Sequence, residues 1–205
     1  MKLVVGLGNP GAAYAGSPHN AGFEVVEALA RRAGAGFRES GRFRAALAKG
    51  ELAGEPVVLM KPLTFMNASG EAVGAWLRWH RMTEADLVVL LDDVDLEPGR
   101  LRIRARGGSG GHKGLASVIQ HTGSDAFVRV RLGVGRGDGE REDVIAHVLR
   151  PLTGAQRETA AAMVAEAADA VEMILGQGVD RAMNRYNTVA GADEKTESKK
   201  QECGH

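Results

Sequence analysis

The sequence predicts an α/β fold: a single-domain, three-layer α/β/α sandwich around a mixed, mostly parallel sheet. Short apolar runs alternate with longer segments in which apolar residues recur at helical spacing, a pattern typical of a parallel sheet covered by helices. Residues 37–58 instead indicate an antiparallel hairpin at one edge, so we expect the sheet to be mixed. The 205 residues contain no internal repeat and no linker that divides the body, which fits one domain.

The individual elements follow from apolar periodicity and from turn residues. Strands are expected over residues 2–7, 43–49, 57–61, 87–92, 100–105 and 127–134, and helices over residues 20–33, 68–81, 115–121, 142–149, 154–175 and 179–186. The first helix places Phe23, Val26 and Ala30 on one face and ends at Gly34. An apolar stripe along the 154–175 helix favours packing on the core over partner binding.

The end of the chain has a different character. Residues 189–205 are polar and lack aromatic side chains, so they cannot contribute much to a core. We therefore expect a folded domain over residues 1–188 and a disordered tail over residues 189–205.

Composition excludes several classes of protein. Hydrophobic residues make up 44% of the chain and charged residues 25%, as in ordinary globular proteins. Lys+Arg and Asp+Glu number 26 each, so any RNA contact must come from a local patch of charge. The apolar run at residues 87–91 is far too short to span a membrane, and the first residues lack a signal-peptide pattern. The single cysteine, Cys203, excludes an internal disulfide framework, and a cytoplasmic protein is expected.

The stretch over residues 3–22 is the organising feature of the sequence. It starts as a strand and breaks into Gly6, Gly8 and Gly11, which fit the G-x-G-x-x-G pattern of dinucleotide-binding proteins. That pattern requires the third glycine to open a helix directly, so that the helix N-terminus meets a pyrophosphate. Here Pro10 lies inside the turn and the chain stays out of helix until about His19. The pattern therefore disfavours a dinucleotide site.

His19 and Asp92 are the first candidates for chemistry. His19 follows the glycine turn, at the sheet edge where ligands usually bind in open α/β folds. Asp92 follows the buried run at residues 87–91 and should reach the same edge. A histidine ordinarily titrates near pH 6.5 and can accept a proton from water. A carboxylate beside it would fix its tautomer and stabilise the imidazolium that forms. A lone histidine is more often structural, so the nearby carboxylate matters to this hypothesis.

Four blocks of sequence in register carry a resemblance to a known family. They are Gly6-Leu7-Gly8-Asn9-Pro10-Gly11 with Tyr14 and His19-Asn20-Ala21-Gly22, then Thr64-Phe65-Met66-Asn67-Ala68-Ser69-Gly70, then Asp92-Asp93-Val94-Asp95-Leu96-Glu97-Pro98-Gly99, and finally Gly110-Gly111-His112-Lys113-Gly114-Leu115. With these blocks the chain resembles the bacterial-type peptidyl-tRNA hydrolases from residue 1 to about residue 188. The resemblance implies a monomeric enzyme without a cofactor. Water would cleave the ester between a peptide and the 3′-terminal ribose of tRNA, which releases both and recycles tRNA from aborted translation.

The resemblance also implies roles for single residues. His19 would act as the base toward water, Asp92 would orient it, and Asn9 would read the first peptide group of the substrate. Asn67 would help to hold the ester or the water, while Tyr14, Phe65 and Met66 would form an apolar wall near the terminal adenosine and the peptide. From the residues alone, the two asparagines could equally cap local turns, and Phe65 and Met66 could equally belong to the core.

His112 and Lys113 close the glycine-rich loop and complete the expected binding site. Lys113 stands where the family most often has Asn. Lysine can donate hydrogen bonds but cannot accept them, and it adds a positive charge. An amide contact to the substrate is therefore in doubt at this position, although a cation could hold a phosphate or the peptide carbonyl.

Arginines recur at alternate positions in two expected strands. They are Arg100, Arg102, Arg104 and Arg106 in one strand and Arg129 and Arg131 in the other. Strand geometry should place those of each strand on one face, which favours phosphate binding over a merely solvated face. By family position, Arg104 and Arg131 would grip the phosphate at the end of the tRNA.

Other interpretations stay open at this point. Asp92, Asp93 and Asp95 could bind a hard cation, but their strand-like spacing and the lack of further ligands disfavour a metal site. Residues 107–111 match G-x-S-x-G around Ser109, but four glycines in five residues indicate a loop rather than a nucleophile elbow. The main rivals in function are a catalytically inactive relative that binds RNA and a nucleotide-dependent enzyme. The expected partner is the acceptor end of peptidyl-tRNA, with no membrane partner.

Overall fold

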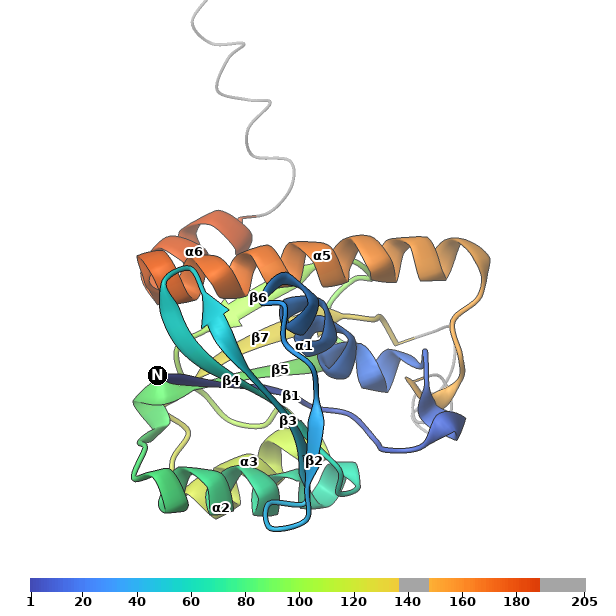
Figure 1. Ribbon diagram of the computed structural model, residues 1–205. Coiled ribbons are helices and arrows are strands. Elements are labelled where there is room, and N and C mark those ends of the chain that lie inside the picture. The colour runs from blue at the N-terminus through green and yellow to red at the C-terminus, as the bar shows by residue number, and fades with distance from the viewer. Residues whose placement is uncertain (137–147, 189–205) are drawn as a thin grey trace, which may run out of the picture.

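A computed structural model describes residues 1–136 and 148–188 of the chain. These residues form a three-layer sandwich around a seven-stranded sheet of order β2-β3-β4-β1-β5-β7-β6 (Figure 1). The strands are β1 Lys2–Gly6, β2 Arg38–Ser40, β3 Ala45–Leu52, β4 Glu55–Pro62, β5 Leu87–Asp93, β6 Leu101–Arg104 and β7 Val128–Gly133. The single-domain α/β/α architecture expected from the sequence is confirmed.

Helices cover both faces of the sheet. One face carries α1 Ala21–Arg32, α5 Gly154–Gln177 and α6 Val179–Tyr186, and the other carries α2 Ser69–His80 and α3 Lys113–Thr122 (Figure 1). Short 3₁₀ turns lie at Ala12–Tyr14, Pro18–Asn20, Met66–Ala68 and Glu84–Asp86. Within the described residues the expected strands and helices are present, with ends shifted by a few positions. The helix expected at residues 142–149 lies, except for its last two residues, outside the described part, as does the tail from residue 189.

The sheet is mixed, with parallel pairs at its centre. β1 pairs in parallel with β4 and β5, and β5 pairs in parallel with β7. The hairpin expected at residues 37–58 is confirmed, because β3 runs antiparallel to both β2 and β4. The antiparallel pairing of β6 with β7 at the other edge was not expected, since the alternation of residues in a strand does not reveal its direction.

The central strand β5 divides the core into two halves. Val88 and Leu90 face α1 and α5, whereas Val89 and Leu91 face α2 and α3, and all four are almost fully buried. Burial of this apolar surface on both faces is the main source of stability in such a layered fold.

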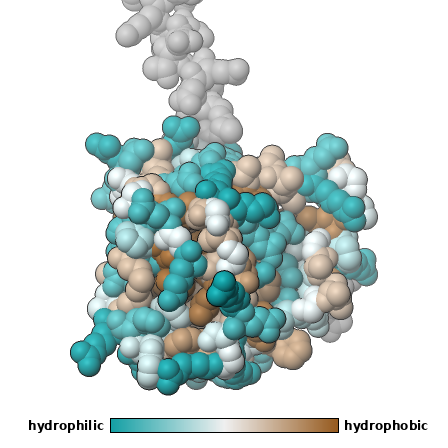
Figure 2. Space-filling view, viewed as in Figure 1, coloured by the Kyte–Doolittle hydropathy of each residue, from teal (hydrophilic) through white to brown (hydrophobic). Residues whose placement is uncertain are grey.

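On the face seen in Figure 2, apolar residues are scattered among hydrophilic ones. None of the described helices is long and apolar enough to cross a membrane.

Two glycines set the position of α1 against the sheet. A Cβ atom at Gly6 would lie 2.1 Å from the carbonyl oxygen of Gly22, and a Cβ atom at Gly22 would lie 2.6 Å from the carbonyl oxygen of Leu90. Backbone can approach this closely only where side chains are absent. The start of α1 is therefore pressed against the ends of β1 and β5, which brings the preceding turn with His19 to the carboxyl edge of the sheet.

The outer edge of β6 is closed by a side chain. Asn187, just after α6, accepts a hydrogen bond from the backbone N–H of Ile103 at 2.7 Å and donates one to its carbonyl at 2.9 Å. An asparagine amide carries both a donor and an acceptor, so it can pair with an exposed strand edge as a neighbouring strand would.

Candidate active site

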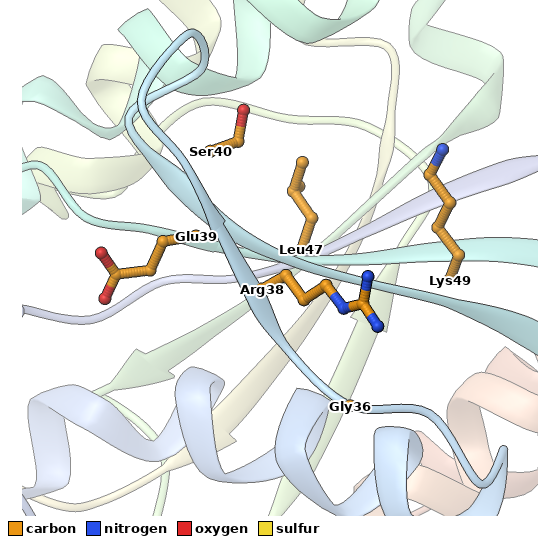
Figure 3. A pocket seen from close by; sticks show the side chains of 6 residues that line it. All are labelled: Gly36, Arg38, Glu39, Ser40, Leu47 and Lys49. Atoms are coloured by element: carbon orange, nitrogen blue, oxygen red, sulfur yellow. The ribbon is translucent and has the colours of Figure 1, made fainter.

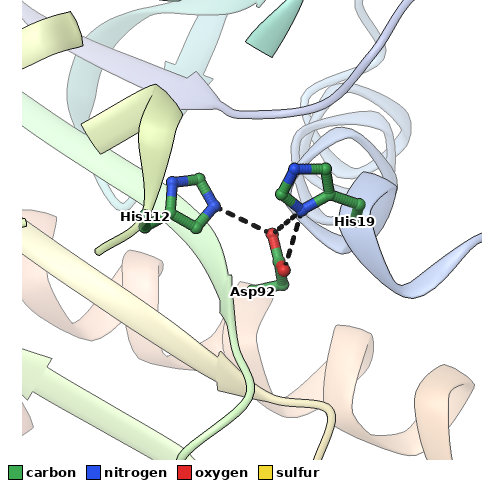
Figure 4. A group of neighbouring side chains, drawn as sticks. All are labelled: His19, Asp92 and His112. Atoms are coloured by element: carbon green, nitrogen blue, oxygen red, sulfur yellow. Dashed lines mark hydrogen bonds and ion pairs between the residues drawn. The ribbon is translucent and has the colours of Figure 1, made fainter. Parts of the chain in front are cut away.

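Three side chains from distant parts of the chain meet at the carboxyl edge of the sheet (Figure 4). His19 comes from the turn before α1, Asp92 from the end of β5 and His112 from the residue before α3. Nδ1 of His19 lies 2.8 Å from each carboxylate oxygen of Asp92. The sequence-based pairing of His19 with Asp92 is therefore present in the structure. Since Nδ1 is turned to the carboxylate, it carries the proton, and Nε2 of His19 is left as an acceptor without a partner among the described residues.

His112 is a second donor to the same carboxylate. Its Nδ1 accepts a hydrogen bond from the backbone N–H of Leu115 at 3.1 Å, which caps the start of α3. Its Nε2 must then carry a proton, and it lies 3.0 Å from Oδ1 of Asp92. The sequence led us to expect His112 as a substrate contact only. Nothing in its spacing reveals the bond to Asp92, because the two residues belong to different elements.

Asp92 is held in its ionised form. Burial, the largest effect, would by itself raise the pKa of this carboxyl group, but the charges and hydrogen bonds of His112 and His19 outweigh it. The pKa of Asp92 therefore lies well below its ordinary value. A permanent carboxylate at this position stabilises positive charge on His19, as a base that accepts a proton requires.

Asn9 is fixed beside this cluster by a reciprocal clamp. The backbone N–H of Asn9 donates to Oδ1 of Asn20 at 2.8 Å, and Nδ2 of Asn20 donates to the carbonyl of Asn9 at 3.0 Å. Oδ1 of Asn9 accepts the backbone N–H of Met66 at 2.9 Å. The Nδ2 group of Asn9 has no hydrogen bond to the described residues, so it remains a donor for a ligand. Sequence reasoning missed Asn20 as a clamp, although it lies in the His19-Asn20-Ala21-Gly22 block.

Asn67 and the three residues of the expected apolar wall differ in exposure. Phe65 is 62% exposed, Asn67 is exposed and Tyr14 is partly exposed, so each can meet a ligand. Met66 is only 5% exposed and packs in the core beneath α3. Contact of Met66 with substrate stays a prediction, and the packing role is the one that its position supports directly.

Lys113 is exposed at the first position of α3. A positive charge in the first turn of a helix opposes the helix dipole, so this residue does not stabilise α3.

Ser109 lies in the glycine-rich turn, and among the described residues no histidine bonds to its hydroxyl. The nucleophile-elbow interpretation therefore gains no support.

The arginines of β6 and β7 differ in exposure and in their contacts. Arg102 pairs with Arg131 and Arg104 with Arg129 across β6 and β7, so these four side chains start on one face, as expected. Arg102 and Arg104 are exposed. Nε of Arg131 lies 2.7 Å from Oδ2 of buried Asp93, although this side chain is still 28% exposed.

Arg129 corrects the expectation of a phosphate-binding pair on β7. It is only 2% exposed, and its guanidinium donates to the backbone carbonyls of Gly107, Asp125 and Phe127. Its function is therefore to hold the start of the glycine-rich loop. Arg100 and Arg106 lie outside β6, where Arg100 donates to the carbonyl of Thr188 and Arg106 lies 3.9 Å from Asp125.

The three aspartates do not converge on a cation. Oδ1 of Asp93 accepts the backbone N–H of Asp95, and Asp95 pairs with Arg136, so both turn away from Asp92. Among the described residues, the donors that do converge are those of His19, Asp92 and His112, within 4.8 Å of one another. Two imidazoles and a carboxylate are donors that zinc accepts. Here the same atoms are satisfied by hydrogen bonds to one another.

A hollow of about 500 Å³ lies on the β2–β3 hairpin (Figure 3). It is lined by Gly36, Arg38, Glu39, Ser40, Leu47 and Lys49, which include none of the expected site residues. The hollow thus shares no residue with the His19 edge, where the side chains suited to proton transfer converge.

The fold and the histidine–carboxylate pair define an α/β/α protein with a site suited to general-base chemistry at the carboxyl edge of its sheet. Comparison with known proteins narrows this class. The model of the family "Peptidyl-tRNA hydrolase" matches residues 3–198. Peptidyl-tRNA hydrolase from Symbiobacterium thermophilum is 47% identical over 91% of this chain and 99% of its own, and that from Mycobacterium tuberculosis is 46% identical over 90% and 96%. The crystal structure of peptidyl-tRNA hydrolase from Acinetobacter baumannii superposes with a TM-score of 0.86 at 34% identity, covering 92% of this chain and 95% of that one. The chain belongs to the peptidyl-tRNA hydrolase family.

Proposed function

We propose that this protein hydrolyses the ester bond between a peptide and the 3′-terminal ribose of tRNA. The observation that carries the proposal is the contact of Nδ1 of His19 with both oxygens of Asp92, which leaves Nε2, unpartnered among the described residues, to act as the base. Membership of the peptidyl-tRNA hydrolase family supports peptidyl-tRNA as the substrate. Release of the peptide recycles tRNA from aborted translation.

In the first step, a water molecule attacks the carbonyl carbon of the ester. Nε2 of His19 takes one proton of that water, and Asp92 stabilises the imidazolium. Negative charge develops on the carbonyl oxygen, and the free Nδ2 group of Asn9 and the amide of exposed Asn67 are donors suited to meet it. When the tetrahedral intermediate collapses, the bond to the ribose oxygen breaks. The imidazolium returns its proton to that oxygen, which gives free tRNA and a peptide carboxylic acid, and the acid then loses its proton to solvent to become the carboxylate.

Asn9 has a second role in this proposal, the recognition of the peptide. A peptidyl-tRNA has a peptide group next to the ester, whereas an aminoacyl-tRNA has a charged amine there. A clamped asparagine amide can hydrogen-bond to a peptide group but gains little from an ammonium group, which has no acceptor for its N–H. The clamp by Asn20 fixes the position of Asn9 before the substrate arrives.

The tRNA would be held by charge and by stacking. Arg104 and Arg131 provide guanidinium groups for the terminal phosphate, and Lys113 adds a positive charge at the start of α3. The exposed ring of Phe65, with Tyr14, offers a face on which the terminal adenine can stack. We expect the enzyme to act as a monomer without a cofactor.

One assay tests the proposal directly. The purified protein should release N-acetyl-amino acid from N-acetyl-aminoacyl-tRNA and should leave free aminoacyl-tRNA intact. The rival, an RNA-binding relative without activity, would bind the same substrate without release, and it is not supported because the histidine–carboxylate pair is complete. Binding of N-acetyl-aminoacyl-tRNA without release of N-acetyl-amino acid, even with the enzyme in molar excess, would refute the proposal.

A further inference from the structure

A second hollow, of about 280 Å³, opens beside Asn9. It lies between the loop at residues 9–16, the first turns of α1 and the end of β4. The residues of its lining that matter here are Asn9, Phe23, Glu24, Glu27, Lys61 and Leu63. The volume is close to the lower end of the range found for small-ligand sites.

The hollow carries an unbalanced negative charge. Nζ of Lys61 lies 2.6 Å from Glu27, and it also lies 4.5 Å from the centre of the Phe37 ring, so its charge is neutralised and its position is fixed. Glu24 has no ion pair or hydrogen bond to any described residue. Its side chain is partly buried, and burial, together with the charge of Glu27, raises its pKa. A cation placed against Glu24 would relieve this cost.

Asn9 belongs both to the lining of this hollow and to the candidate active site. Its side chain is held toward Met66 on the catalytic side, while the same residue lines the hollow. If Asn9 reads the first peptide group, the next part of the peptide lies one residue further on, a step of at most about 3.6 Å. Phe23 and Leu63 supply apolar surface for a side chain on that path.

We propose that this hollow receives the amino-terminal end of short peptides, with the α-ammonium group against Glu24. The inference rests on the proposed function and adds a substrate class to it: tRNAs that carry peptides of two or three residues with a free, charged N-terminus. Glu24 is then a specificity residue that contacts the substrate and takes no part in the proton transfers.

The test compares matched substrates on each variant. The substrates are a dipeptidyl-tRNA with a free amino terminus and the same molecule N-acetylated, together with the corresponding tripeptidyl pair. The measured quantity is the ratio of kcat/KM for the free form to that for the acetylated form. We expect a ratio of about five or more for the wild type in at least one pair. Glu24→Gln should reduce that ratio to about one, and Glu24→Lys should invert it.

The control variant removes the same charge far from the site. Glu84 lies in the 3₁₀ turn before β5, at the opposite edge of the sheet, so Glu84→Gln should keep the wild-type ratio. Thermal melting identifies any variant that does not fold, and the ratio is insensitive to the active fraction of a preparation. A wild-type ratio near one in both pairs, or an unchanged ratio in both Glu24 variants, would overturn the inference. Failure of the wild type to hydrolyse N-acetyl-aminoacyl-tRNA would instead refute the proposed function.

Discussion

Nε2 of His112 lies 3.0 Å from Oδ1 of Asp92, an oxygen that Nδ1 of His19 also approaches to 2.8 Å. Two imidazoles therefore share one carboxylate, and only one of them has a nitrogen free for chemistry. Nδ1 of His112 is occupied by the backbone N–H of Leu115, whereas Nε2 of His19 has no partner among the described residues. The shared carboxylate thus assigns different roles to two side chains of the same type.

His112→Ala should lower kcat without abolishing it. The change removes one of the hydrogen bonds that hold Asp92 and the cap of α3, so we expect a loss of about tenfold in kcat and about 1 kcal/mol in the free energy of unfolding. Steady-state kinetics with N-acetyl-aminoacyl-tRNA and urea unfolding measure the two effects. His112→Asn can still cap the helix and should recover most of the stability but not the activity. Equal activity in all three proteins would contradict a positioning role for His112.

His19→Ala should remove nearly all hydrolysis while RNA affinity stays close to the wild-type value. General-base catalysis by a positioned side chain contributes about 10²–10⁴-fold, and within the described residues no second base reaches the same point. Single-turnover hydrolysis and tRNA binding check this. His121, at the far end of α3, gives a control variant, His121→Ala, that should keep its activity. Activity of His19→Ala within about threefold of the wild type would remove His19 from the mechanism.

The depressed pKa of Asp92 should be visible in the pH dependence of stability. A carboxyl group whose pKa is lower in the folded state than in the unfolded state stabilises the fold above its unfolded value of about 3.9 and loses that contribution as pH falls through the folded value. The difference in unfolding free energy between the wild type and Asp92→Asn should therefore shrink as the pH is lowered from about 5 to 3. Urea unfolding at a series of pH values measures it. A difference that stayed constant or grew in this window would contradict the assignment.

Arg104→Ala should affect tRNA binding and Arg129→Ala should affect stability, although the two residues are paired across neighbouring strands. Loss of exposed Arg104 should weaken tRNA binding and lower the slope of log affinity against log salt by roughly 0.7–0.9, with little change in stability. Loss of buried Arg129 removes the guanidinium donor from the backbone carbonyls of Gly107, Asp125 and Phe127 and should cost about 1–3 kcal/mol of stability. Salt titrations of tRNA binding and urea unfolding separate the two. Equal effects of both variants on both measurements would contradict this division.

Arg131 is the more complex member of the basic face because it also pairs with Asp93. Arg131→Ala should lower the salt slope as Arg104→Ala does, and in addition it should destabilise the fold by leaving the buried carboxylate of Asp93 unpaired. Adding Asp93→Asn to Arg131→Ala should restore stability and leave the reduced slope. Recovery of the wild-type slope in the double variant would show that Arg131 does not bind phosphate.

Lys113→Asn should change substrate affinity and leave the shape of the pH–rate profile. Lys113 has three donors and no acceptor, so we expect it to position the substrate while His19 carries the proton. Lys113→Glu should raise KM further, because it sets a negative charge against RNA. Profiles of kcat and KM against pH check both variants. If Lys113→Asn removed a basic limb and cut kcat by about a hundredfold, lysine would be the proton carrier.

The sequence predicted those site residues whose positions follow from a local pattern, such as the end of a strand or a glycine turn. The apolar run at residues 87–91 is followed by Asp92, and the glycine turn delivers His19 to the same sheet edge, so strand direction places the two residues together, while the family resemblance supplied their roles. The second bond to Asp92 and the burial of Arg129 depend on how loops fold over the sheet. Alternation in a strand fixes the face on which Arg129 lies, but not whether carbonyls from residues 107–127 will cover that face. Such long-range packing has no signature in residue spacing.

The amide of Asn187, bonded to both backbone groups of Ile103, has a consequence for the order of assembly. β6 is complete in sequence by residue 104, yet its outer edge has no cover until residue 187 is available, more than eighty residues later. A chain still emerging from the ribosome, or one shortened before this point, presents a bare strand edge that other chains can join. The turn after α6 therefore closes the β6 edge of the nascent protein, and it can do so only once residue 187 has been synthesised.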